Sequence, residues 1–235
     1  AMFSYGGRVL NAYFVVFTAA EEEKAGQEAL QLGQLVNQAR VRPDDTARAM
    51  GLPARPVEEG ETVESMPPLR WNRCLLAAVQ GHATDMLDRG FCDTVDPDGK
   101  TAADRAVDAG FEGEITGEWV GSAGLCGCDD LGDRVARLFR RAFHSEWLGS
   151  VGERNVLNPD CSVFAVAFVS GYSETLGGIC GPDVGLWAAD FGRHEKGDEE
   201  AEEASEAEES RRLLTGVLYE DRDGDGLYGL GEGLE

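Results

Sequence analysis

Two adjoining stretches in the second half of the chain decide the fold: residues 152–160 (GERNVLNPD) and residues 161–169 (CSVFAVAFV). The second stretch is short and rich in β-branched and aromatic residues, which predicts a strand. Apolar residues recur at helical spacing through residues 130–148, which predicts a helix just before the first stretch. The polar stretch therefore connects a helix to a strand.

The rest of the chain mixes helical and strand patterns without a regular β-α-β alternation. Helical spacing of apolar residues predicts helices over residues 21–40, 75–89 and 101–109. Short β-branched or apolar runs predict strands over residues 115–120, 186–191 and 213–219. Residues 42–68 are rich in proline and acidic or polar residues, which favours a long surface loop. This order of elements predicts an α+β fold.

The composition excludes two classes of partner. The 235 residues include 44 acidic and 21 basic side chains, for a formal net charge of −23. Such a surface repels nucleic acid and anionic membranes, so neither is expected as a partner. No run of apolar residues is long enough to span a membrane. The apolar fraction of 42% is sufficient for a packed core.

The two ends of the chain differ in character from its middle. Residues 9–20 are apolar, follow Arg8 and end in small residues, which fits either a signal sequence or a packed strand or helix. Residues 195–210 are almost entirely acidic or small, which is typical of a solvated linker or of an isolated exposed helix. The predicted organisation is an N-terminal segment (1–20), a main domain (21–194), an acidic linker (195–210) and a tail (211–235).

The six cysteines are an even number, which is compatible with three disulfides formed in an oxidising compartment. The alternative is a set of buried free thiols. Cys161 and Cys180 flank a predicted strand and turn, and they are the best candidate pair.

A calcium-binding loop is predicted in the tail. Its sequence, residues 221–232 (DRDGDGLYGLGE), fits the pattern D-x-[DN]-x-[DN]-G-x5-E at every constrained position. Calcium takes six to eight oxygen ligands, and alternate carboxylates can surround one centre. The expected ligands are the side chains of Asp221, Asp223, Asp225 and Glu232 and the backbone carbonyl of Leu227, with Gly226 permitting the turn.

The alternative for this loop is an acidic turn in an acidic protein. A predicted strand enters the loop, and the printed sequence holds no second loop of this kind. Calcium is therefore expected to order the tail rather than to switch the main domain.

Several motifs together resemble the bacterial branch of the CAP superfamily, which comprises cysteine-rich secretory, antigen 5 and pathogenesis-related 1 proteins. They are residues 36–40 (VNQAR), 67–72 (PPLRWN), 152–160 (GERNVLNPD) and 187–192 (WAADFG), in this order. The resemblance covers about residues 21–192. It implies a three-layer α/β/α sandwich and a secreted or extracellular location.

The resemblance also implies a cavity in which two His and two Glu can bind a divalent metal, and this chain departs from that pattern. Asp93 falls where the first His is expected, Glu118 keeps a Glu, and Glu153 replaces the second His. Glu146 and His144 are both candidates for the fourth position. Carboxylates alone suit calcium or magnesium rather than zinc. The alternatives are an oxygen-only cation site and a degenerate cavity with solvated carboxylates.

Three functions follow as hypotheses. The first is an extracellular module that binds a lipid, a peptide or a cell-wall component. The second is a hydrolase that uses Asp93, Glu118 and Glu153 in acid–base or metal-assisted chemistry. The third is a structural spacer in a larger secreted protein. No catalytic residue is assigned, because the loss of both family histidines argues against an enzyme, and no Ser-His-Asp arrangement can be read from the spacing. His82 is expected to be a hydrogen-bonded structural residue.

Overall fold

A computed structural model of the chain describes residues 2–5, 8–17, 19–53, 65–124, 131–149, 154–177, 182–194 and 213–220. Four strands form a sheet in the order β3 (Arg70–Trp71), β5 (Val163–Tyr172), β6 (Asp183–His194) and β4 (Gly113–Gly124). The β3–β5 pair is parallel, and the other two pairs are antiparallel. Because β4 is the last strand in this order, one of its edges is not paired with another described strand.

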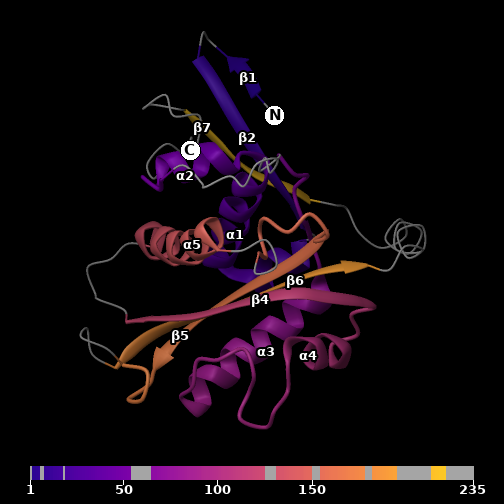
Figure 1. The fold of residues 1–235 in the computed structure, drawn as a ribbon, viewed down its shortest axis with the longest axis vertical. Coiled ribbons are helices and arrows are strands. Elements are labelled where there is room, and N and C mark those ends of the chain that lie inside the picture. The colour runs from indigo at the N-terminus through magenta and orange to yellow at the C-terminus, as the bar shows by residue number, and fades with distance from the viewer. Residues whose placement is uncertain are drawn as a thin grey trace.

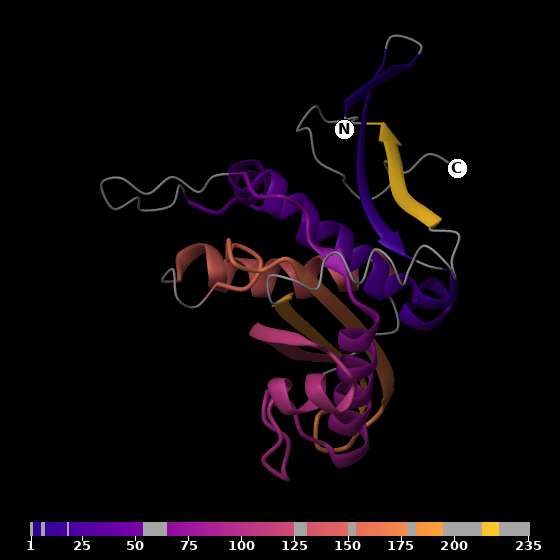
Figure 2. The same cartoon turned by 90° about the vertical axis from the view of Figure 1, so that its right-hand side faces the viewer.

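Helices cover both faces of this sheet, which makes a three-layer sandwich (Figures 1 and 2). One face carries α1 (Ala19–Val41) and α5 (Leu131–Leu148), and the other carries α3 (Arg73–Arg89) and α4 (Ala102–Asp108). The predicted α/β/α architecture is therefore confirmed. None of the described helices is both long and apolar enough to cross a membrane.

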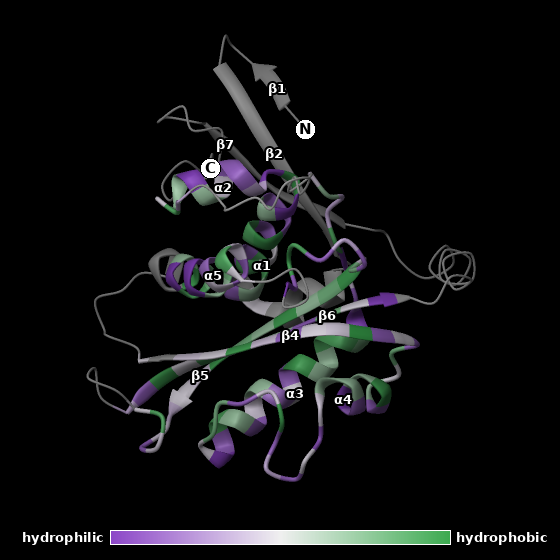
Figure 3. Ribbon diagram, in the orientation of Figure 1, coloured by the Kyte–Doolittle hydropathy of each residue, from purple (hydrophilic) through white to green (hydrophobic). Residues whose placement is uncertain are grey.

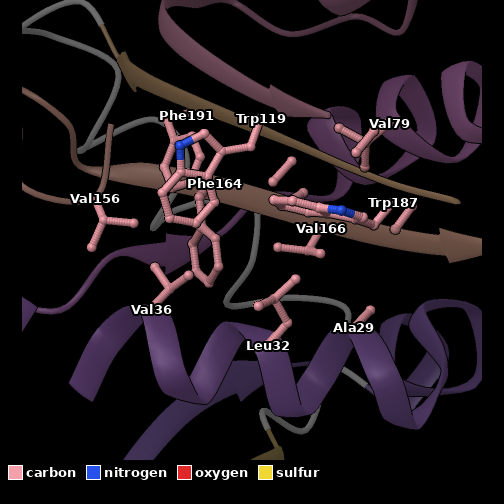
Figure 4. Packing of buried hydrophobic residues seen from close by; sticks show 14 of the residues in the cluster. Ala29, Leu32, Val36, Val79, Trp119, Val156, Phe164, Val166, Trp187 and Phe191 are labelled. Atoms are coloured by element: carbon pink, nitrogen blue, oxygen red, sulfur yellow. The ribbon is translucent and has the colours of Figure 1, made fainter. Parts of the chain in front are cut away.

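The core lies on both faces of the two central strands. Residues 163–167 of β5 and 184–192 of β6 are buried, and the apolar residues of these strands lie between the helices (Figure 3). Ala29, Leu32 and Val36 follow one face of α1 and point toward Phe164, Val166 and Trp187 of the sheet (Figure 4). Their spacing of three and four residues is the period that predicts this helix.

Local signals in the sequence explain where two helices begin and end. The Asn72 side chain accepts hydrogen bonds from the backbone N–H groups of Cys74 and Leu75, at 2.9 and 3.0 Å, and so caps α3. Gly90 ends this helix with a φ of 69°. Thr101 and Asp104 form the capping box of α4. These two predicted helices are confirmed.

The predicted loop over residues 42–68 is wrong in part, because α2 (Pro43–Ala49) lies within it. Pro43 occupies the first turn of this helix, where its missing N–H costs nothing. The same residue therefore both follows α1 and begins the next helix.

The two ends of the chain meet in a second sheet. Its strand order is β1 (Met2–Tyr5), β2 (Arg8–Phe17) and β7 (Leu213–Glu220), and β2 runs antiparallel to β7 from the pair Leu10–Glu220 to the pair Phe17–Leu213. The apolar N-terminal residues thus form a strand, one of the two expected interpretations. The acidic linker and the calcium loop lie outside the described residues.

Cys74, Cys92 and Cys161 are free thiols in this structure. Cys161 is buried, and its thiol donates to the carbonyl oxygen of Val163 at 3.3 Å. The expected pairing of Cys161 with Cys180 is therefore not formed here. Disulfides stay a prediction for Cys126, Cys128 and Cys180, which lie outside the described residues.

A buried arginine connects α1 to the segment that precedes β5. Arg40 is 0% exposed, and its guanidinium donates to the carbonyl oxygens of Pro67 (2.9 Å), Val156 (2.6 Å), Asn158 (2.9 Å) and Cys161 (3.1 Å). Burial lowers the pKa of this guanidinium from its usual value, and the nearby Cys161 and Glu146 oppose that shift.

The other side of the same segment is held by an acid. Glu146 of α5 is 4% exposed, and its carboxylate accepts hydrogen bonds from the backbone N–H groups of Val156 (3.1 Å) and Leu157 (3.2 Å). Residues 154–161, which we call the clamped segment, are thus held by Arg40 at their carbonyls and by Glu146 at their amides. The negative charge of Glu146 also favours the charged form of Arg40.

We expect Arg40→Met to lower the free energy of unfolding by about 3–5 kcal/mol, because it leaves several buried carbonyl groups without donors. Arg48→Met is the matched control: Arg48 lies on α2 with 76% of its side chain exposed, and its ion pair with Asp45 is at the surface. Urea unfolding followed by circular dichroism measures both variants. A loss below about 1 kcal/mol for Arg40→Met would contradict the structural role of this residue.

Candidate functional site

The candidate site is a cavity of about 510 Å³ beside the outer edge of β4. Five consecutive residues of β4, from Glu118 to Ser122, form one wall. Helix α5 provides the opposite wall, and the segment after α3 closes one side. The remaining lining residues are Cys92, Thr94, Leu138, Arg141, Ala142, Ser145, Glu146, Asn155 and Trp187.

Two glycines of β4 allow large side chains to approach this edge. A side chain at Gly117 would collide with the amide group of Asn155, and one at Gly121 would collide with the indole of Trp187. Asn155 uses this space to donate a hydrogen bond from Nδ2 to the carbonyl oxygen of Glu118 at 3.1 Å. The clamped segment therefore determines one end of the cavity.

The aromatic wall comes from two tryptophans that pack edge to face. The rings of Trp119 and Trp187 have centroids 5.8 Å apart and an interplanar angle of 73°. Trp187 is 3% exposed, and its indole N–H has no hydrogen-bond partner among the described residues. A buried donor without a partner costs free energy.

Glu118 is the acid at the centre of a buried polar cluster on the α3 side of the sheet. Only 6% of its side chain is exposed, and its Oε1 accepts a hydrogen bond from Nη2 of Arg105 at 2.6 Å. The same oxygen lies 3.6 Å from Nε2 of His82. Burial raises the pKa of Glu118 to about 8, and Asp190 adds to the shift while Arg105 opposes it.

His82 is held by the segment that follows α3. Its Nε2 lies 2.9 Å from the backbone carbonyl oxygen of Asp93, and because a carbonyl only accepts, this nitrogen carries the proton. The residue is 2% exposed, and burial lowers its pKa, with Arg105 adding to the effect. The expected hydrogen bond of His82 is present, and its structural role stays a prediction.

Asp190 lies directly opposite Glu118 in the β4–β6 pair. It is 1% exposed, and neither of its carboxylate oxygens has a hydrogen-bond partner among the described residues. Burial raises its pKa to about 7, opposed by Arg105. One guanidinium therefore faces two buried carboxyl groups, and it cannot neutralise both.

The sequence-predicted cavity residues are only partly brought together. Glu118 lines the cavity, whereas Asp93 is exposed and its carboxylate accepts from the backbone N–H of Val95 at 3.3 Å. Glu153 lies outside the described residues, as do the calcium-loop residues Asp221, Asp223, Asp225, Leu227 and Glu232. Of the two candidates for the fourth position, Glu146 lines the cavity and His144 is exposed.

The described residues do not fit the divalent metal that the resemblance implies. They contain no group of three or more His, Cys, Asp or Glu side chains that could hold an ion. Glu118 is engaged by Arg105, and Glu146 is engaged by two backbone amides. Burial raises the pKa of Glu146 to about 7, and these amide hydrogen bonds oppose the shift.

Sequence reasoning missed Arg105, Asp190 and Trp187. Asp190 could have been noticed, because it is the one charged residue in an otherwise apolar strand, residues 186–191 (LWAADF). Arg105 gives no such signal: it reaches Glu118 only because α4 packs beside β4.

The fold is a three-layer α/β/α sandwich with a cavity beside the outer edge of its sheet. The profile of the cysteine-rich secretory protein family, CAP, matches residues 34–180, which is more than half of the chain. The chain belongs to this family.

Comparison with solved structures gives a match to the crystal structure of an extracellular protein containing an SCP domain from Bacillus anthracis strain Ames. The sequence identity is 15% and the TM-score is 0.40, and the match covers 71% of this chain and 40% of that chain. This chain thus corresponds to less than half of the length of that protein. A search of curated proteins gives no match.

We expect Asp190→Asn to weaken the pH dependence of stability. The pKa of Asp190 is higher in the folded protein than in the unfolded chain, so the folded state holds its proton more tightly and stability falls as pH rises from about 4 to about 7. Removing this group should make the variant gain roughly 2 kcal/mol relative to the wild type between pH 5 and pH 8.

Chemical denaturation at both pH values measures this change. Asp183→Asn is the control, because Asp183 is exposed on the same strand. Equal pH dependence in Asp190→Asn and the wild type would refute the burial of an unpartnered carboxyl group.

Proposed function

We propose that the protein is an extracellular binding module whose ligand occupies the cavity between β4 and α5. The observation that carries this proposal is a cavity of ligand size whose lining joins apolar surface to neutral polar side chains. Its volume of about 510 Å³ is typical of ligand sites in proteins.

The chemistry of the walls supports a ligand with both apolar and polar parts. Leu138, Ala142 and the two tryptophans provide apolar surface, whereas Ser122, Ser145 and Asn155 provide neutral polar groups. Arg141 is exposed and lines the cavity, where it can attract an anionic group. The family membership supports a location outside the cell. The acidic composition argues against nucleic acid as the ligand.

One observation favours hydrolysis as a second candidate function. Glu118 and Glu146 line the same cavity and both have raised pKa values, of about 8 and about 7, as acid–base catalysts require. Each carboxyl group is already engaged, Glu118 by Arg105 and Glu146 by the clamped segment. This engagement makes binding the better supported function.

We also propose that the tail binds calcium at residues 221–232. The supporting structural fact is that β7 ends at Glu220, directly before Asp221, and pairs with β2 up to Leu10. A calcium ion held by Asp221, Asp223, Asp225, the carbonyl of Leu227 and Glu232 would fix the end of β7. Calcium would then stabilise the pairing of the two ends of the chain.

The cavity proposal predicts that Ser145→Trp abolishes ligand binding. Ser145 lines the cavity from α5 and is exposed, so a large side chain there fills the volume without removing a buried contact. Leu148→Trp is the control, since Leu148 is 47% exposed on the same helix and does not line the cavity.

The probes are soluble peptidoglycan fragments, neutral phospholipid vesicles and a mixed pool of linear peptides, titrated while tryptophan fluorescence is recorded. Binding of one probe class that survives in Leu148→Trp and disappears in Ser145→Trp supports the proposal. Equal binding by both variants would refute it. Turnover of peptide, ester or phosphodiester substrates that Glu118→Gln abolishes would instead establish the hydrolase.

The calcium proposal predicts one binding event per chain by calorimetry, lost in Glu232→Gln because the closing bidentate ligand is removed. Asp183→Asn, which lies outside the loop, should keep this event. A second event that persists in Glu232→Gln would place another ion elsewhere, and no heat at millimolar calcium would overturn the proposal.

A further inference from the structure

The outer edge of β4 presents backbone groups to the cavity. Five consecutive residues of one strand, Glu118 to Ser122, line the cavity. Consecutive strand residues point their side chains to opposite faces of a sheet. A cavity that touches all five must therefore run along the edge of the strand, where the backbone itself is accessible.

Two independent contacts establish which backbone groups point outward. The carbonyl of Glu118 accepts from the side chain of Asn155, which belongs to neither β4 nor β6, as expected if the N–H and C=O of Glu118 face away from β6. On the other side of β6, the carbonyl of Gly192 accepts from the N–H of Ser162, which directly precedes β5. The backbone groups of even-numbered β6 residues therefore bond to β5. Those of odd-numbered residues bond to β4, where Ala189 lies opposite Trp119 and Trp187 lies opposite Gly121.

The same alternation places the backbone groups of Val120 and Ser122 on the outer edge. Within the described residues, β4 pairs only with β6, and no other backbone group is bonded to Val120 or Ser122. Both residues are partly exposed. The edge thus offers a row of donors and acceptors that repeats every two residues, about 6.7 Å, and an extended backbone matches this repeat.

We propose that the ligand of the cavity is an extended peptide from another molecule, which adds a strand to β4 at Val120 and Ser122. This inference rests on the proposed binding function and names the class of its ligand. Main-chain hydrogen bonds give affinity in this mode of recognition, and alternate side chains give specificity. Asn155, already bonded to Glu118, marks the end of the open edge.

The two sides of the cavity define the preferred peptide. Side chains that point toward α5 meet Leu138, Ala142 and Trp187, which favours apolar residues. Side chains that point toward α3 meet Ser122 and Thr94, which favours hydrogen-bonding residues. A peptide that alternates apolar and hydrogen-bonding residues fits both sides.

The test begins with a library of blocked hexapeptides in which apolar positions alternate with randomised ones. The library is selected on the wild type and on Val120→Pro. Proline removes the outward N–H of Val120 but no hydrogen bond to β6, and an edge strand tolerates it. Val120→Ala is the matched control, since it shortens the side chain and keeps the N–H. Circular dichroism verifies that both variants are folded.

We expect selected peptides to bind Val120→Pro about tenfold more weakly than the wild type or Val120→Ala. A selected peptide is then N-methylated at its even or at its odd positions, which blocks one backbone edge at a time. Only one of the two methylated forms should lose binding.

Three results would overturn the proposal: no peptide enriched on the wild type over Val120→Pro, equal binding of both methylated forms, or equal affinities of Val120→Pro and Val120→Ala. A probe that Ser145→Trp excludes and Val120→Pro still binds would keep the cavity as the ligand site while refuting the added strand.

Discussion

The structure depends on the way Arg40 and Glu146 hold the clamped segment from its two sides. The buried guanidinium of Arg40 donates to four carbonyl groups, one at Pro67 and three in the clamped segment. The buried carboxylate of Glu146 accepts from two amides of the same segment. Neither charge could remain buried without these partners, because the cost of desolvation is several kcal/mol for each ion. The segment has no helix or strand of its own, so these contacts supply the order that regular hydrogen bonding gives elsewhere.

The candidate site follows from that constraint. The clamped segment carries Asn155 to the edge of β4, and the space for it exists because Gly117 has no side chain. On the opposite side of the same strand, Arg105 holds Glu118, while Asp190 remains buried without a partner among the described residues. Of the acids that line the cavity, Glu118 is engaged by Arg105 and Glu146 by two backbone amides. The groups that remain open to a ligand lie along the backbone edge of β4.

The sequence predicts the elements better than the contacts between them. The helix over residues 73–89 is readable because Asn72, Gly90 and the apolar period are all local signals. Helix α2 is absent from the sequence prediction because the prolines and polar residues of 42–68 favour a loop, whereas Pro43 lies in the first turn of a helix. Glu118 was found through the family resemblance. Asp190 and Arg105 were missed because their proximity depends on the β4–β6 register and on the packing of α4, which local patterns do not encode.

The most direct test of this account is amide hydrogen exchange at Val156 and Leu157, measured by NMR in the wild type and in Arg40→Lys. The account predicts that both amides are strongly protected in the wild type, although they lie in no helix or strand. Arg40→Lys, which keeps the charge but loses the fork of donors, should accelerate their exchange while the amides of β5 and β6 remain protected. Rapid exchange of Val156 and Leu157 in the folded wild type would contradict the claim that this clamp organises the site.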